Sequence, residues 1–196
     1  MIDVGQDDLP ILTISPSMYS RIASCQYRVF LDRRRRGPTA TAPVSAASIL
    51  GSAGHLALQR LVETGTLHVT DLSGPAGAAW DEAIIEVAGS VGAATKLPGY
   101  YLKAARFTNT AIRLQHLVRN ASALEPEVEL RSADGFIVGR ADLIARGGFG
   151  TWIIDYKSGV EREAGTGKAL IDEHENQLRL YSFLWANSHG DWPTAT

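Results

Sequence analysis

Cysteine is scarce in this sequence, since Cys25 is the single cysteine among 196 residues. One cysteine cannot close a disulfide within the chain, which is typical of proteins from reducing compartments. It also cannot supply the ligands of a four-cysteine metal cluster. We therefore expect a cytoplasmic protein that folds without internal disulfides.

Long apolar runs are absent as well. No stretch of about 18 apolar residues occurs, which is the length that a membrane-spanning helix needs. The N-terminus carries Asp3, Asp7 and Asp8 in place of the basic and apolar segments of a signal peptide. The sequence predicts neither a membrane span nor export, so no membrane partner is expected.

The chain also lacks a large excess of charge of one sign, because 19 Lys and Arg face 21 Asp and Glu. Without a global positive field, any contact with nucleic acid has to be local. What is present is ordinary for a globular protein, with 45% hydrophobic and 20% charged residues. At about 150 residues per domain, the length corresponds to a single domain.

The first half of the chain has the residue spacing of helices. The first helix begins at Ser15-Pro16, because serine is a good N-cap and proline fits the first turn. It ends in Arg33–Arg36, and these arginines either face solvent at a helix end or contact phosphate. Further helices are predicted at residues 48–63, 77–90 and 99–122.

The spacing becomes alternating from Pro126, which indicates strands. Turn residues separate the alternating runs, so a meander of neighbouring antiparallel strands is expected. The segment 158–167 is rich in glycine and is expected to be a loop. The strands are predicted at residues 128–131, 136–146 and 151–157, and a last helix at 170–187.

Charged residues that could take part in catalysis or bind an ion lie on the predicted second and third strands. Alternation places Asp155 and Lys157 on one face, and a hairpin in register brings Asp142 to the same level. Two close carboxylates repel each other, so a cation has to offset them, and a hard ion such as Mg²⁺ would do so. The alternative is a surface ion pair of Asp155 and Lys157 at a strand end.

Two helices carry further candidates. His55 lies in an apolar helix after Gly51 and Gly54, which are poor helix formers and suggest the close approach of another backbone or a ligand. Gln177 and Tyr181, four residues apart, share one face of the last helix. Taken alone, His55 could equally be a core histidine, and Gln177 and Tyr181 could be the polar tips of a packed helix.

Together these residues resemble the RecB-like, AddB-like exonuclease branch of the PD-(D/E)XK nuclease superfamily. That branch has four motifs in a fixed order, and this sequence has residues that match each of them over roughly residues 12–186. The matching residues are Gly51 or Gly54 before His55, Gly139 to Asp142, Asp155-Tyr156-Lys157 followed by Gly159, and Gln177 with Tyr181.

The resemblance implies an α/β fold with a restriction-endonuclease-like core, in which a short mixed sheet is flanked by helices. One nuclease domain would span residues 1–196, with its core at about 12–186 and a helical insertion at about 66–124. By the same resemblance, Mg²⁺ or Mn²⁺ would be bound by His55, Asp142, Asp155 and the main-chain carbonyl of Tyr156.

The resemblance also assigns roles around this metal. Lys157 would orient the attacking water and stabilise charge on the phosphate. Glu127 and Glu129 share a strand face where relatives often carry an acid, and Glu129 is the expected outer ligand. The residues expected to support the site or bind substrate are Gln177, Tyr181, Arg34 and Arg35.

The implied function is a metal-dependent deoxyribonuclease, an exonuclease or DNA-end processing enzyme of recombination, repair or defence that acts beside a helicase. The alternatives are a catalytically inactive subunit that binds nucleic acid or scaffolds a helicase–nuclease complex, and an RNA-directed hydrolase. Many relatives bind an iron–sulphur cluster through one cysteine in the first helix and three near the C-terminus.

Only the first of those cysteines has a counterpart here, Cys25. No iron–sulphur cluster is therefore expected in this chain. Either the protein is a cluster-free member in which Cys25 is a buried thiol, or the sequence is a fragment truncated at its C-terminus.

Overall fold

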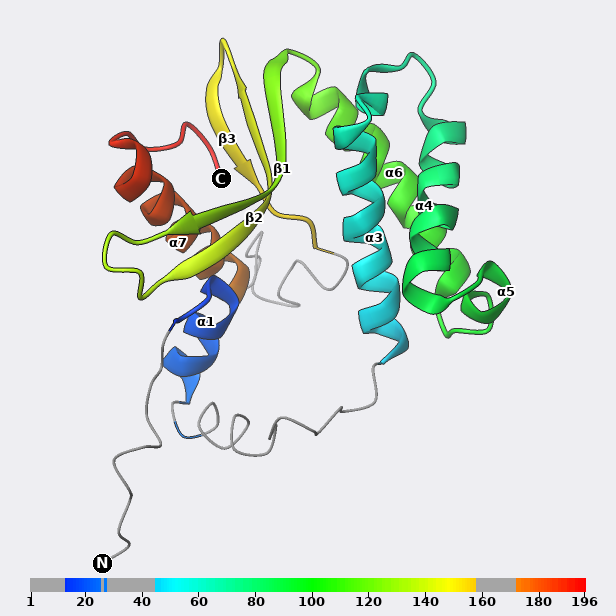
Figure 1. Cartoon of the computed structure of the whole chain (residues 1–196), viewed down its shortest axis with the longest axis horizontal. Helices are drawn as coiled ribbons and strands as arrows, with labels where there is room; N and C mark the ends of the chain where they lie inside the picture. The colour runs from blue at the N-terminus through cyan, green and yellow to red at the C-terminus, as the bar shows by residue number, and fades with distance from the viewer. Residues whose placement is uncertain (1–12, 26, 28–44, 158–171) are drawn as a thin grey trace, which may run out of the picture.

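The computed structural model describes residues 13–25, 27, 45–157 and 172–196. Within these residues a three-stranded antiparallel sheet, in the order β1-β2-β3, is flanked by helices and gives a mixed α/β fold (Figure 1). The elements are α1 (Pro16–Ser24), α3 (Ala46–Glu63), the 3-10 helix η2 (Thr66–His68), α4 (Ser73–Ala88), α5 (Val91–Ala94), α6 (Tyr100–Val118), β1 (Ala121–Arg131), β2 (Val138–Gly147), β3 (Gly150–Ile154) and α7 (Asp172–His189).

Helices α3, α4 and α6 pack together on one side of the molecule and form the larger hydrophobic core (Figure 1). α3 begins at Ser45, whose hydroxyl accepts a hydrogen bond from Ser48 N at 3.1 Å and so caps the helix. Trp80 of α4 is buried in this core, with its ring centroid 5.3 Å from that of Phe107 of α6. This packing fixes α3 beside β1 and β2.

Helices α1 and α7 lie together on the other side of the sheet (Figure 1). A second, smaller core forms between α7 and the strands from the residues Leu130, Ala141, Ile144, Ile153, Tyr181, Leu184 and Trp185. β2 contributes to both cores, because Leu143 belongs to the larger one and its neighbour Ile144 to the smaller one.

The hairpin of β1 and β2 changes direction at Glu127. Residues two apart in a regular strand share a face, yet Ala141 packs in the smaller core and Leu143 in the larger one. The change falls at Asp142, and the register of its neighbours places Glu127 opposite this residue. Glu127 has a φ of 54°, in the left-handed region that a non-glycine residue seldom adopts. β1 and β2 are bent along their length (Figure 1).

The edge of β2 that faces away from β1 is shared between two segments. β3 pairs with residues 143–147, while Ile14 donates to Phe136 O at 2.7 Å and accepts from Val138 N at 3.0 Å. Residues 139–142 lie between these two pairings. The Ile14–Ile137 bridge is parallel, whereas the three named strands are antiparallel. Parallel pairing, which a mixed sheet implies, is confined in the described residues to isolated bridges.

The second parallel bridge joins β3 to the C-terminal residues. Trp152 is bridged to Ala195, Thr194 N donates to Thr151 O at 2.7 Å, and Ile153 N donates to Ala195 O at 3.0 Å. Residues 194 and 195 therefore lie along the outer edge of β3.

The predicted elements are present with shifted ends. β1 begins at Ala121 instead of residue 128, and β2 at Val138 instead of residue 136. β3 ends at Ile154, so Asp155 and Lys157 directly follow the strand and do not belong to it. α4 to α6 lie between α3 and β1 in the chain. None of the described helices is both long and apolar enough to cross a membrane.

Two expectations about individual residues are wrong. Cys25 is exposed, not buried, because α1 ends at Ser24 and Cys25 lies just beyond the helix. Gly54 does not make room for a ligand: a Cβ there would lie 3.9 Å from the ring of Trp80, an ordinary contact between α3 and α4. Arg33–Arg36 and the glycine-rich segment 158–167 lie outside the described residues.

Candidate metal centre

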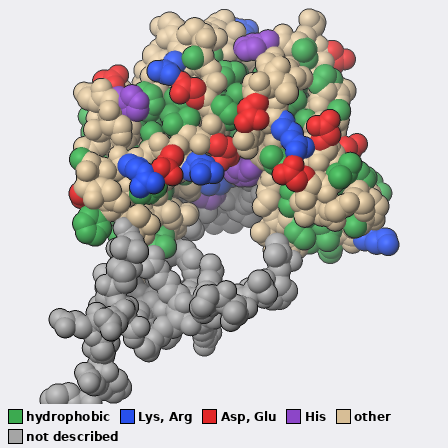
Figure 2. Space-filling view, viewed as in Figure 1, with side chains coloured by type: hydrophobic (Ala, Val, Ile, Leu, Met, Phe, Trp, Pro, Cys, Tyr) green, Lys and Arg blue, Asp and Glu red, His purple; other side chains and the backbone are tan. Residues whose placement is uncertain are grey.

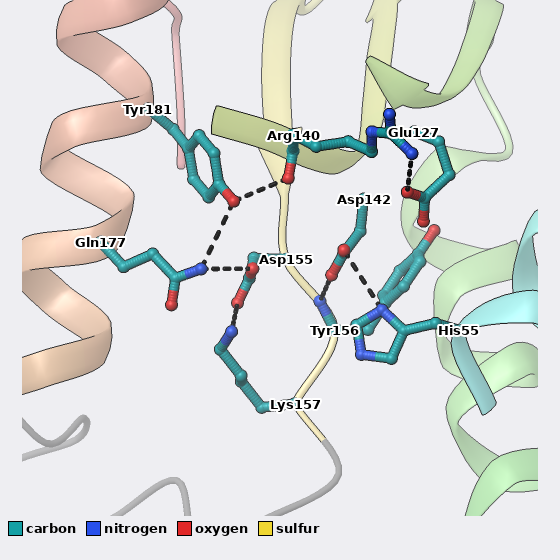
Figure 3. Close-up of polar contacts among 9 residues, drawn as sticks. All are labelled: His55, Glu127, Arg140, Asp142, Asp155, Tyr156, Lys157, Gln177 and Tyr181. Carbon is teal, nitrogen blue, oxygen red and sulfur yellow. Dashed lines mark hydrogen bonds and ion pairs between the residues drawn. The ribbon is translucent and has the colours of Figure 1, made fainter. Parts of the chain in front are cut away.

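Three side chains that could hold a metal ion converge where the hairpin bends. His55 of α3, Glu127 of β1 and Asp142 of β2 each offer one ligand atom, and these atoms all lie within 4.8 Å of one another. Figure 3 shows the three side chains directed toward one another from their separate elements. In the space-filling view, acidic, basic and histidine side chains gather between the sheet and the helices (Figure 2).

Asp142 is at the centre of this group, and its side chain is only 11% exposed. Its Oδ1 lies 3.2 Å from His55 Nδ1, and its Oδ2 accepts a hydrogen bond from the main-chain N of Tyr156 at 2.5 Å. The hydrogen bond with Asp142 raises the pKa of His55, and burial opposes this effect. Asp142 therefore connects α3 to the chain that follows β3.

Asp155 is turned toward a different set of partners. Lys157 Nζ lies 2.6 Å from Asp155 Oδ2, and Gln177 Nε2 donates to Asp155 Oδ1 at 3.2 Å. The Asp155 side chain is 6% exposed, and burial raises its pKa while Lys157 lowers it. The carboxylate is thus held between a cation and an amide donor (Figure 3).

Helix α7 is attached to β2 through Tyr181. The phenol donates a hydrogen bond to the carbonyl of Arg140 at 2.7 Å, in the stretch of β2 that neither β3 nor Ile14 covers. Burial raises the pKa of Tyr181 to about 12, so the hydroxyl keeps the proton that it donates. Gly139 leaves space for the ring, because a Cβ there would lie 2.8 Å from Tyr181 Cε1. Gln177 N ε2 also lies 3.4 Å from the Tyr181 hydroxyl.

Glu127 is the less tightly held of the two acids in the converging group. Its Oε2 lies 4.0 Å from Arg140 Nη1, and its side chain is 26% exposed. Burial and the nearby charge of Asp142 raise its pKa, and His55 and Arg140 oppose the shift. A carboxyl group with this environment is stabilised in its charged form by any further cation.

The donor chemistry fits a divalent metal ion. Carboxylate oxygens are the preferred ligands of Mg²⁺ and Mn²⁺, and a neutral imidazole binds transition metals. The three groups already lie within 4.8 Å of one another, and Asp142 is oriented by a main-chain hydrogen bond. Such support of a ligand by a second hydrogen bond is common at metal sites.

The structure brings most of the expected site residues to one place. His55 and Asp142 are in the converging group, and Asp155, Lys157, Gln177 and Tyr181 follow beside it through the contacts described above. Tyr156 joins the site through its main-chain N, while its ring packs against the larger core, and burial raises the pKa of its phenol.

The expected acid of β1 is in a different position. Glu129 is outside the converging group, and its Oε1 accepts from Arg131 Nε at 2.7 Å near the surface. Glu127 takes the place beside Asp142 instead. The available signal was Pro126, since a proline in a strand often accompanies an irregularity. Arg34 and Arg35 lie outside the described residues.

The comparison with protein families agrees with this arrangement of side chains. No curated protein and no solved structure matches this chain. The model of one family does match it, over residues 13–195, and this range contains every side chain of the site. Nearly the whole chain is covered by the match. On this ground, the chain belongs to the PD-(D/E)XK nuclease superfamily.

Proposed function

We propose that the protein is a metal-dependent deoxyribonuclease that hydrolyses phosphodiester bonds. The observation that carries this proposal is the convergence of His55, Glu127 and Asp142 next to the ion pair of Asp155 and Lys157. A metal-binding group and a fixed ammonium group in one site are what phosphodiester hydrolysis needs.

In this proposal Mg²⁺ or Mn²⁺ is held by His55, Glu127 and Asp142, with Asp155 and the carbonyl of Tyr156 as further ligands. When bound, the ion supplies a water of lowered pKa and offsets charge that develops on the phosphate. We assign the acid of β1 to Glu127, because Glu127 belongs to the group that converges with His55 and Asp142 and Glu129 does not.

The chain's own groups prepare the site for this reaction. The main-chain N of Tyr156 orients Asp142, and Gln177 orients Asp155. Lys157 is 26% exposed, so its ammonium can meet both the attacking water and the phosphate while Asp155 holds it. Tyr181 supports the site by attaching α7 to β2.

We further propose the RecB-like branch and an exonuclease or DNA-end processing role in recombination, repair or defence, beside a helicase. The support for this finer assignment is the order of the four sequence motifs. Arg34 and Arg35 remain proposed substrate contacts on the same basis.

The test uses end-labelled single- and double-stranded DNA, linear and circular, with Mg²⁺, Mn²⁺ or EDTA, and an RNA of the same sequence. Wild type should cleave DNA only with a metal, and linear substrates before circular ones. Asp155→Ala and Lys157→Ala should lower the rate by at least about a hundredfold, since each removes a group that acts on the transition state. Glu125→Ala, which removes an exposed carboxylate of β1, is the matched control.

Circular dichroism should show that all variants keep the wild-type fold. Cleavage by Asp155→Ala or Lys157→Ala at the wild-type rate would contradict the site. If wild type neither cleaves nor binds Mn²⁺, the protein is instead a non-catalytic subunit with a nuclease fold.

A further inference from the structure

Arg140 lies over the proposed metal site and has no role in the mechanism above. Arg140 is two positions before Asp142 on β2, and its guanidinium extends toward Glu127 above the converging side chains (Figure 3). The side chain is 63% exposed. Its main chain, in contrast, is fixed, because its carbonyl accepts the hydrogen bond of Tyr181 and its Cα pairs with Glu129. Arg140 therefore combines a fixed main chain with an exposed guanidinium.

The ion pair that holds this guanidinium is weak. Its nitrogen and the Glu127 oxygen are 4.0 Å apart, whereas Lys157 Nζ and Arg131 Nε lie 2.6 and 2.7 Å from their carboxylate partners. An exposed ion pair at such a distance contributes little and is readily exchanged. Of these three cations, Arg140 is the one most easily transferred to a new anion.

The charge of Glu127 determines how strongly the Arg140 guanidinium is held in its present position. Glu127 and Asp142 are neighbouring carboxylates, and the Arg140 guanidinium offsets part of their charge. Once the Glu127 carboxylate serves as a metal ligand, its charge is offset at the site and the attraction on Arg140 falls. A guanidinium can then form paired hydrogen bonds to a phosphate, the geometry for which arginine is best suited.

We propose that Arg140 binds a phosphate of the nucleic-acid backbone, and that it exchanges Glu127 for this phosphate when Glu127 binds metal. The inference rests on the proposed function, because it takes the substrate to be a phosphodiester chain. It makes substrate binding depend on metal through a single side chain.

The first experiment measures the affinity for a fluorescein-labelled DNA duplex and for its single strand in Ca²⁺, a hard ion with the same preference for oxygen ligands. Arg140→Ala should weaken binding about tenfold, as expected for the loss of one charged hydrogen-bonding contact. It should also lower the dependence of log affinity on log salt by about one phosphate contact. The DNA affinity of Arg140→Lys should lie between those of wild type and Arg140→Ala.

The matched control is Arg146→Ala. Arg146 lies on the same strand, is also exposed and is also paired with a glutamate of β1, Glu125, but it is six residues from Arg140 and beyond the bend. Removal of this equal charge should leave the affinity and the salt dependence close to those of wild type.

The second experiment tests the exchange itself in EDTA. Glu127→Gln releases Arg140 without metal, so it should raise the metal-free affinity for DNA several-fold. In the double variant Glu127→Gln with Arg140→Ala, most of this gain should be lost. A gain of equal size with and without Arg140 would reflect only the removed negative charge and would overturn the exchange.

Mn²⁺ titration by calorimetry separates this inference from the proposed function. Arg140→Ala should bind Mn²⁺ at least as tightly as wild type, because a repelling cation has been removed. If wild type cleaves DNA but Arg140→Ala and Arg146→Ala bind it equally well, the inference about Arg140 is wrong and the proposed function stands. If wild type binds no Mn²⁺, the proposed function itself is wrong.

Discussion

At the scale of single residues, the protonation of His55 makes the stability of the metal-free protein depend on pH. Its pKa is raised above the ordinary value of 6.5 by the hydrogen bond with Asp142. The folded protein without metal therefore binds the His55 proton more tightly than the unfolded chain does. The resulting stabilisation is fully present below about pH 6.5 and is lost as the pH rises through the raised pKa.

We expect the difference in free energy of unfolding between wild type and His55→Gln, in EDTA, to be largest below about pH 6.5 and to shrink toward higher pH. Urea titrations at several pH values measure it. His68→Gln, which removes an exposed imidazole outside the site, is the control. A difference that grows with pH would show that His55 is not stabilised in its charged form by Asp142.

Residue types and spacing singled out Asp142, Asp155 and Lys157 as candidates, whereas His55 became one only through the family resemblance. The structure places His55 and Asp142 in the converging group and pairs Asp155 with Lys157. Glu127 was not predicted as the β1 acid beside Asp142, because its place depends on a left-handed backbone and on the strand register. The turn residues indicated a loop over 132–135, but β2 begins only at Val138. The Ser132 hydroxyl, which accepts from Ile137 N at 2.9 Å, helps to hold this longer loop.

At the scale of elements, Gly139 fixes how α1 and α7 meet β2. A Cβ at this position would lie 2.7 Å from Pro16 Cγ of α1 and 2.8 Å from Tyr181 Cε1 of α7. Both helices would have to move, and the hydrogen bond from Tyr181 to the Arg140 carbonyl would be strained. The glycine of the Gly139-to-Asp142 motif and the tyrosine of the last helix therefore form one contact.

Gly139→Ala should lower the free energy of unfolding by about 1–3 kcal/mol, the usual cost of overpacking. Gly148→Ala is the matched control, because a Cβ there has no neighbour within 4 Å and its cost should be within about 0.5 kcal/mol. Chemical denaturation measures both. Equal stability of the two variants would mean that α1 and α7 do not pack as closely on β2 as the structure places them.

The helices α3 and α7 were predicted more accurately than the strand β1. The spacing of α3 and α7 follows from their own residues, and their ends lie within two residues of the prediction. β1 extends seven residues before its predicted start, because its first half pairs with β2 without a clear alternation of apolar and polar residues. Pairing partners distant in sequence decide such a strand, and local patterns do not reveal them.

At the scale of the whole molecule, the two cores share β2. Leu143 and Ile144 are adjacent in sequence but pack on opposite sides, each with less than 2% of its surface exposed. Loss of one core would leave the other with an unsupported strand. The two cores should therefore unfold together.

Urea titrations of Trp80→Phe and of Trp185→Phe test this cooperativity, because Trp80 lies in the larger core and Trp185 in the smaller one. In each variant, fluorescence and far-ultraviolet circular dichroism should give the same midpoint. Separate midpoints would show that the helical side and the α7 side are independent folding units.

The attachment of residues 194 and 195 to β3 bears on self-association. An open strand edge presents unpaired N–H and C=O groups, which can recruit a strand of another molecule and start fibrous aggregation. Here Thr194 N already donates a hydrogen bond to Thr151 O, and Ala195 O accepts one from Ile153 N. A second molecule could pair with this edge of β3 only after residues 194 and 195 had separated from it. These residues therefore hinder the extension of the sheet from one molecule to the next at this edge.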